Sequence, residues 1–93
     1  MQEDKSIRIL VSGKVQHVGF RYSIQKVANQ LEIFGFVRNL PNGDVEIEAY
    51  GDSEKLEQLE KYCFNGGPPL ARVDRIQVTK IPYTEYSDFH IKM

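Results

Sequence analysis

The chain has 93 residues, of which 41% are hydrophobic and 27% are charged, and its formal net charge is −1. This length allows one domain with one modest core, and the balanced composition excludes a disordered or fibrous protein. Because the charge is near zero and no apolar run reaches membrane-spanning length, we expect neither nucleic acid nor a membrane as a partner.

The first third of the chain predicts a strand followed by a helix. Residues 1–5 are polar and contain no apolar signal segment, so we expect a short flexible tail before a single domain over residues 6–93. Apolar residues at alternate positions predict a strand over residues 7–12. Apolar residues at helical spacing then predict a helix that begins near Arg21 and ends at Gly35.

The middle of the chain predicts a hairpin and a second helix. Strands are expected over residues 36–39 and 45–50, because the Asn-Gly pair at positions 42–43 is a strong hairpin signal. Asp52 or Ser53 is then expected to cap a second helix, whose apolar positions fall on one face.

The last third predicts a break and two further strands. Glycines and prolines at 66–69 interrupt the chain, and a strand follows over residues 72–81. Val73 and Ile76 fall on opposite phases of that strand, which indicates a β-bulge. A short final strand is expected over residues 88–93. The order βαββαβ predicts an α+β fold, the ferredoxin-like split βαβ sandwich, with two helices on one face of a mostly antiparallel, four- to five-stranded sheet.

The segment over residues 13–21 has the character of an anion-binding turn. Gly13 and Gly19 bracket a turn between the first strand and the first helix, where several backbone N–H groups lack helical partners. These groups lie at the positive end of the helix dipole, and such helix starts bind oxyanions. Arg21 adds a planar fork of donors that suits two phosphate oxygens.

Other chemistries fit the sequence poorly. The turn lacks the Gly-Lys-Ser/Thr run of a nucleotide-binding P-loop. His17 and His90 are the only histidines and lie far apart in the sequence, so we expect no metal site. Cys63, the only cysteine, lies on the apolar face of the second helix. A structural role for its thiol is therefore favoured over a nucleophilic one, and a reducing cytoplasm is the expected compartment.

Two segments resemble the signatures of the acylphosphatase family. Residues 11–21 are similar to the first signature and residues 35–39 to the second, in the same order. The resemblance covers residues 7–92 and departs from the usual pattern at His17, where glycine is more common. The later positions that agree are Gly43, Val45, Gly51, the Gly-Gly-Pro of 66–68, the Ala-Arg-Val of 71–73 and the Asp-Phe of 88–89.

This resemblance implies hydrolysis of a carboxyl–phosphate anhydride to a carboxylate and inorganic phosphate, without metal or cofactor. Arg21 and Asn39 would be the catalytic residues. Arg21 would hold the phosphoryl oxygens, and Asn39 would hold the attacking water. A small-molecule acyl phosphate is the implied substrate, and we expect a monomer. The residues expected to bind phosphate beside Arg21, through their backbone N–H groups, are Gln16, His17, Val18, Gly19 and Phe20.

Alternatives remain at the level of single residues and of the whole chain. Arg21 alone suits a solvated arginine at a helix start, and Asn39 alone suits the end of a strand. A non-catalytic anion-binding regulatory module is the main alternative function, although such a module has no need of a residue that holds water. A ribonucleoprotein-type binder of the same architecture is disfavoured by the net charge. The sequence does not identify residues that would recognise the acyl group.

Overall fold

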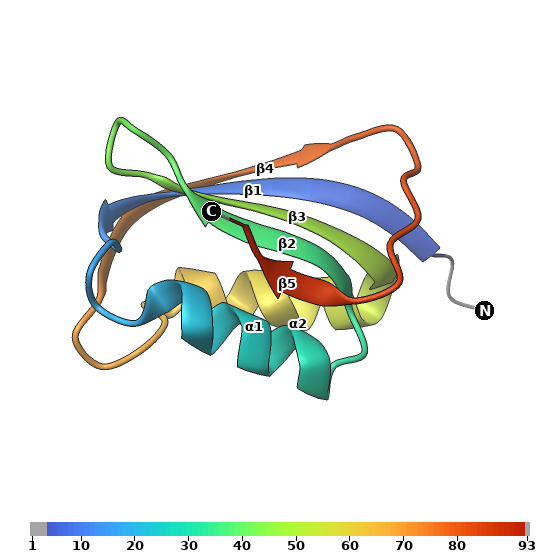
Figure 1. Cartoon of the computed structure of the whole chain (residues 1–93), viewed down its shortest axis with the longest axis horizontal. Helices are drawn as coiled ribbons and strands as arrows, with labels where there is room; N and C mark the ends of the chain where they lie inside the picture. Colours follow the sequence, from blue (N-terminus) through green and yellow to red (C-terminus); the bar gives the residue numbers. More distant parts are fainter. Residues whose placement is uncertain (1–3, 93) are drawn as a thin grey trace.

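The computed structural model describes residues 4–92 as a five-stranded sheet with two helices packed on one face (Figure 1). The strand order is β4-β1-β3-β2-β5; the pair β2–β5 is parallel and the other pairs are antiparallel. This arrangement confirms the predicted ferredoxin-like α+β class. The elements in chain order are β1 (Asp4–Lys14), α1 (Phe20–Gln30), β2 (Phe34–Asn39), β3 (Val45–Asp52), α2 (Ser53–Phe64), β4 (Arg72–Lys80) and β5 (Phe89–Ile91).

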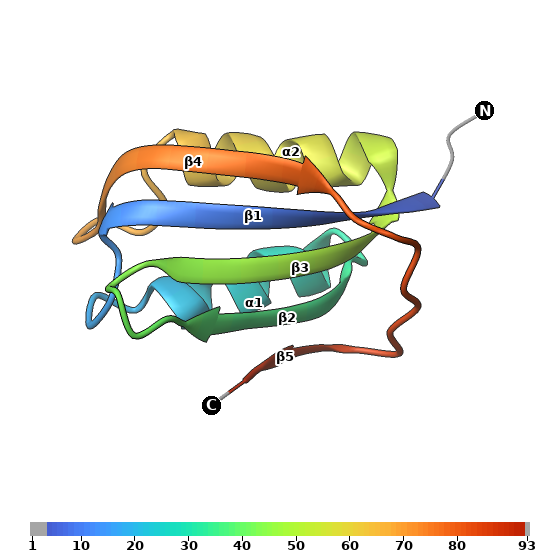
Figure 2. The ribbon, with the colours of Figure 1, turned by 90° about the horizontal axis from the view of Figure 1, so that it is seen from above.

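The core lies between the sheet and the helix layer. Seen from above, both helices run behind the sheet and roughly along its strands (Figure 2). Each helix turns one apolar stripe inward against the alternate residues of the central strands, as the helical spacing predicts. Neither helix within residues 4–92 is long and apolar enough to cross a membrane. The buried helix residues are Phe20, Ile24 and Ala28 of α1 and Leu56, Leu59 and Cys63 of α2.

The single cysteine belongs to this core. Cys63 is a free thiol with no exposed surface, and burial raises its pKa to about 12. The thiol is therefore protonated at neutral pH and packs as a small hydrophobic group, because the thiolate is the reactive form. Its position agrees with the structural role that the sequence favours.

The predicted irregularity in β4 is confirmed. Ser12 of β1 lies opposite Arg75, whereas Gly13 lies opposite Val73, so Asp74 is the extra residue of a bulge. The side chain of Arg72 donates a hydrogen bond from Nε to Asp74 Oδ1 over 2.9 Å on the same strand. The bulge occurs where β1 leaves the sheet, immediately before the glycine-bracketed turn.

Two predicted boundaries were wrong at the start of the chain and at its end. Asp4 and Lys5 belong to β1, opposite Asp52 and Gly51 of β3, and are not part of a tail. Only long-range pairing makes these polar residues a strand, so the local pattern did not indicate it. The remainder of the expected tail, residues 1–3, lies outside the described residues, and so does Met93. The expected final strand is shorter than predicted, since β5 spans only Phe89–Ile91.

The predicted end of α1 was also wrong. The helix ends at Gln30, and the N–H of Ile33 donates to the Ala28 carbonyl over 2.9 Å. This bond closes a Schellman turn, in which Glu32 takes the left-handed conformation with φ 58°. Gly35, the expected helix end, lies within β2 instead and pairs with β3.

Replacing Glu32 by glycine should stabilise the protein. A left-handed conformation costs a non-glycine residue about 1–2 kcal/mol, part of which is offset by the greater unfolded-state entropy of glycine. We expect Glu32→Gly to raise the free energy of unfolding by about 0.5–1 kcal/mol, measured by urea denaturation. Glu32→Ala removes the same charge and keeps the unfavourable φ, so it should give no gain. An equal gain in both variants would show that charge, rather than backbone conformation, is responsible.

Candidate active site

The turn between β1 and α1 presents an uncapped helix start. Gly19 occupies the N-cap position of α1 in a left-handed conformation, with φ 77° and ψ 17°. Among residues 4–92 no side chain caps the helix by a hydrogen bond, and its first turn contains no acidic residue. The N–H groups and the positive end of the helix dipole are thus left without the usual protein anion. Such a helix start favours a bound oxyanion.

A pocket of about 250 Å³ lies over this helix start. It brings the turn and Arg21 together with the end of β2 and with β5, which are distant in sequence. Five of the residues singled out from the sequence line it: His17, Gly19, Phe20, Arg21 and Asn39. The remaining lining residues are Val15, Tyr22 and Ile91.

Asn39 lines the pocket from the end of β2 and contributes an amide side chain. It is the last residue of β2 and lies opposite Val45, a buried core residue of β3. Its side-chain oxygen Oδ1 is buried and has no hydrogen-bond partner within the described residues. A buried unpaired acceptor costs about 1–3 kcal/mol, so native structures rarely retain one without a reason. A hydrogen bond donated by a ligand or a water molecule would satisfy it.

Gln16 joins the turn to the strand that carries Asn39. Its side-chain Nε2 donates to the Leu40 carbonyl over 2.8 Å and to the Asp44 carbonyl over 2.9 Å, at both ends of the β2–β3 hairpin turn. The side chain of Gln16 does not line the pocket. Its expected role in phosphate binding therefore rests on the backbone N–H, while the side chain positions the turn.

The other predicted residues of the turn differ in what their side chains do. Phe20 is 1% exposed and belongs to the core, so only its backbone is available to a ligand. His17 is exposed at the pocket and has φ 65°, a left-handed conformation that is uncommon outside glycine. The Val18 side chain packs against the core and does not line this pocket.

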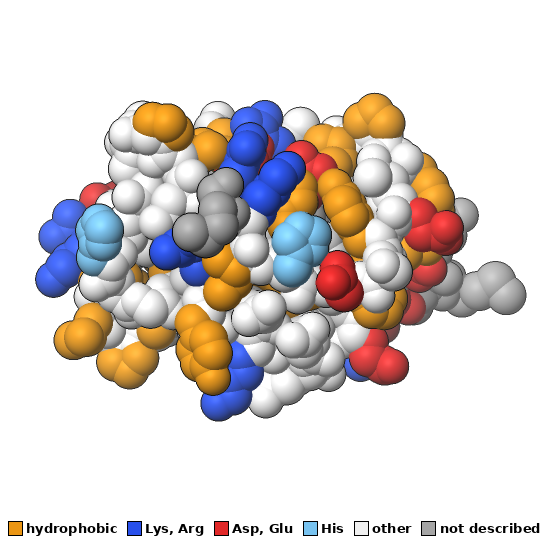
Figure 3. Space-filling view, in the orientation of Figure 1, with side chains coloured by type: hydrophobic (Ala, Val, Ile, Leu, Met, Phe, Trp, Pro, Cys, Tyr) orange, Lys and Arg blue, Asp and Glu red, His pale blue; other side chains and the backbone are white. Residues whose placement is uncertain are grey.

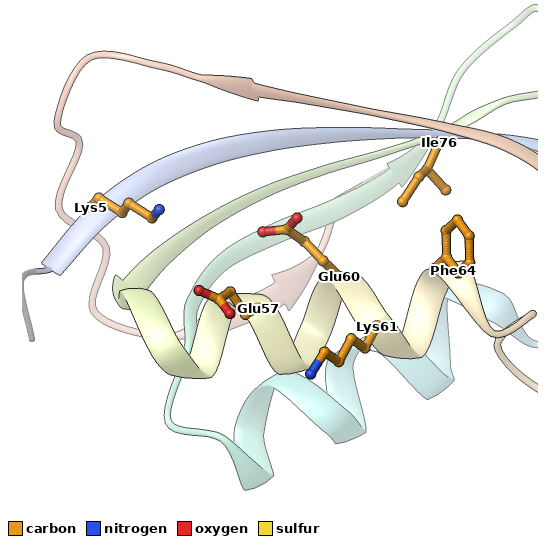
Figure 4. A pocket seen from close by; sticks show the side chains of 6 residues that line it. All are labelled: Lys5, Glu57, Glu60, Lys61, Phe64 and Ile76. Atoms are coloured by element: carbon orange, nitrogen blue, oxygen red, sulfur yellow. The ribbon is translucent and has the colours of Figure 1, made fainter.

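Another hollow, of about 530 Å³, lies between α2 and β4 (Figure 4). Phe64 and Ile76 face each other at one end of it, and charged side chains surround the rest. Two of these are basic and two acidic, so the hollow has no net charge that would attract a phosphate. The pocket over α1 is the better anion site. The charged residues are Lys5, Glu57, Glu60 and Lys61.

Comparison with known proteins identifies the family. The acylphosphatase family model matches residues 7–91. This chain belongs to the acylphosphatase family. An acylphosphatase of Methylococcus capsulatus is 42% identical over 88 residues, which cover 94% of this chain and 95% of that protein.

Solved structures of the family superpose closely. An acylphosphatase from Coxiella burnetii has a TM-score of 0.91 at 39% identity, over 96% of this chain and 93% of that one. The acylphosphatase from Bacillus subtilis has a TM-score of 0.90 at 37% identity, over 95% and 98% of the two chains. These findings confirm the resemblance seen in the two signatures. They support an enzyme that hydrolyses acyl phosphates over a non-catalytic anion-binding module.

Removing the Gln16 side chain should loosen the turn. Gln16→Ala deletes both hydrogen bonds to the hairpin carbonyls, and we expect it to lower the free energy of unfolding by about 1–2 kcal/mol. We also expect the KM for an acyl phosphate to rise, because the turn is no longer held relative to β2. Urea denaturation and steady-state kinetics would measure the two effects.

Gln25→Ala provides a matched control. The Gln25 side chain also donates to a backbone carbonyl, that of Phe89 over 3.2 Å, and it does not line the pocket. The control should lose stability without a change in KM. An unchanged KM in Gln16→Ala as well would contradict the positioning role of Gln16.

Proposed function

We propose that the pocket over α1 is the catalytic site, where small acyl phosphates are hydrolysed to a carboxylate and inorganic phosphate without a metal. The observation that carries this proposal is the buried, unpaired Oδ1 of Asn39, which shares one pocket with Arg21 and the uncapped start of α1. Donors for a phosphoryl group and a residue that can accept a hydrogen bond from water thus line the same space.

The phosphoryl group would be held by the turn and by Arg21. Phosphoryl transfer depends mainly on positioning and on stabilising the charge of the equatorial oxygens. The half-buried guanidinium of Arg21 can donate to two oxygens at once, and the helix dipole adds to its positive potential. These fixed donors would supply the charge stabilisation that bound cations provide in other phosphoryl-transfer sites. The backbone N–H groups assigned to the remaining contacts are those of Gln16, His17, Val18, Gly19 and Phe20.

Asn39 would position the nucleophile. Oδ1 would accept a hydrogen bond from a water molecule. This bond would orient the water so that a lone pair of its oxygen points toward phosphorus. The new phosphorus–oxygen bond forms as the bond from phosphorus to the acyl oxygen breaks, and a phosphoryl oxygen takes the water proton. The carboxylate is a stable leaving group and needs no strong general acid. A site without an Asp/Glu pair or a triad is therefore sufficient.

The same proposal includes the setting in which the enzyme works. We place it in the cytoplasm, where a single buried free thiol is stable, and we expect a monomer. A net charge of −1 gives no general attraction to nucleic acid.

Substitution of the two catalytic residues tests the mechanism. With benzoyl phosphate as substrate and a chelator present, we expect Arg21→Ala and Asn39→Ala each to lower kcat by about 10²–10³-fold, the usual effect of losing one preorganised group. Arg21→Lys should also be impaired, since an ammonium cannot bind two oxygens with a planar fork. Arg75→Ala and Asn29→Ala, at exposed positions outside the pocket, are the matched controls.

Three results would count against this account. Full activity of Arg21→Lys would exclude two-point binding by the guanidinium. Full activity of Asn39→Ala would remove the water-holding role. Loss of wild-type turnover with chelator, restored by a divalent cation, would show that the reaction needs a metal.

A further inference from the structure

A groove adjoins the pocket over α1, called the phosphate pocket after its proposed ligand, on the side of α1 that faces α2. It has a volume of about 640 Å³ and shares two lining residues, Gly19 and Tyr22, with the phosphate pocket. Most of its wall is apolar, and among residues 4–92 Lys26 is the only charged residue that lines it. The apolar and aromatic lining residues are Val18, Tyr22, Val27, Tyr62, Pro68 and Pro69.

The wall of the groove opposite α1 is formed by the loop that follows α2, which packs closely against the start of α1. The N–H of Gly67 donates to the Tyr62 carbonyl over 3.1 Å, and the N–H of Ala71 donates to the Pro68 carbonyl over 3.0 Å. A Cβ at Gly67 would lie 2.6 Å from the Phe20 ring, so this loop sits directly on the first residue of α1. The two prolines that follow have a fixed φ, which limits the conformations of this loop and favours a largely preformed groove, as is typical of small-molecule sites.

The boundary between pocket and groove is open. A Cβ built on Gly19 would meet nothing within 4 Å, so no neighbouring side chain fills the space beside it. Asn39 lines the phosphate pocket but not the groove. In an in-line displacement the leaving group departs on the side opposite the attacking water. With water held at Asn39, the acyl group leaves away from that residue, and the groove that adjoins the pocket at Gly19 and Tyr22 is not lined by Asn39.

Part of the apolar surface of the groove is exposed to solvent and is not buried in the core. Tyr22 is 69% exposed at the boundary, although it is a large aromatic residue. Hydrophobic side chains gather at this corner of the molecule, around the start of α1 and the loop after α2, and a basic side chain lies beside them (Figure 3). Exposed apolar patches next to a polar site are frequently ligand-binding surfaces.

We propose that this groove binds the acyl part of the substrate and gives the enzyme a preference for apolar, ring-sized acyl groups, with the Tyr22 ring as the main contact. The assignment rests on the proposed function, since it requires the phosphoryl group to sit over α1. An acetyl group is too small to reach beyond the boundary, whereas a benzoyl ring extends over Tyr22 into the groove. Tyr22 thereby acts as a specificity-determining residue.

The test compares kcat/KM for benzoyl phosphate and acetyl phosphate. Tyr22→Ala should lower the benzoyl-to-acetyl ratio of kcat/KM about tenfold, which equals about 1.4 kcal/mol. Tyr22→Phe should keep the wild-type ratio, because the contact is made by the ring and not by the hydroxyl. Tyr83→Ala is the control, because Tyr83 is 61% exposed and lines neither the phosphate pocket nor the groove. This variant should also keep the wild-type ratio.

The outcomes separate this assignment from the proposed function. An equal loss of kcat/KM for both substrates in Tyr22→Ala would show that Tyr22 acts on the phosphoryl side and would overturn the assignment. Wild-type kcat/KM for both substrates in Tyr22→Ala would overturn it as well, while leaving the hydrolysis itself intact. A folded wild type that hydrolyses neither substrate would refute the proposed function and the assignment with it.

Discussion

Two hydrogen bonds from the Gln16 side chain hold the turn before α1 against the hairpin that follows Asn39. The two walls of the phosphate pocket come from segments that are not neighbours along the chain, and these bonds are a direct link between them. Because transition-state stabilisation depends on placing donors to within a fraction of an ångström, a link of this kind bears on catalysis as well as on stability. The rest of the site depends on the relative position of turn and strand that it sets.

On the face of the sheet opposite the helices, β2 is held by a cluster of charged side chains. Glu46 is only 3% exposed and accepts hydrogen bonds from Arg8 Nε over 2.7 Å and from Arg38 Nε over 2.5 Å, which joins β1, β3 and β2. Since side chains alternate across a strand, Arg38 on the outer face and Asn39 on the helix side are placed together. Arg38 precedes Asn39 in the sequence, yet its guanidinium binds Glu46 and does not line the pocket.

Features that are unfavourable for folding gather at the phosphate pocket. The α1 helix lacks a side-chain cap, His17 adopts a left-handed conformation, and the Asn39 acceptor is unpaired. By contrast, α2 has an ordinary cap, in which Asp52 Oδ1 accepts a hydrogen bond from the Glu54 N–H over 2.9 Å. Natural proteins tend to depart from such local rules at functional sites, where the unsatisfied groups are kept for a ligand. The contrast between the two helix starts therefore supports the proposed position of the site at the start of α1.

The sequence by itself predicted the order of the elements and proposed Arg21 and Asn39 as the catalytic residues. Periodicity and the Asn-Gly turn predicted the fold class and the bulge in β4, because each of these signals depends on residues close together in the chain. The two signatures led to the hypothesis that Arg21 and Asn39 act together. Tertiary structure decided what depends on distant partners. The pairing of Asp4 with β3, the Schellman turn at Glu32 that displaced Gly35 as the helix end, and the hydrogen bonds of Gln16 to the hairpin all belong to this group. The groove beside Gly19 does too, since its wall comes from a loop that only packing brings against Phe20. A local pattern records the conformational preference of a segment, but not which segment it will meet.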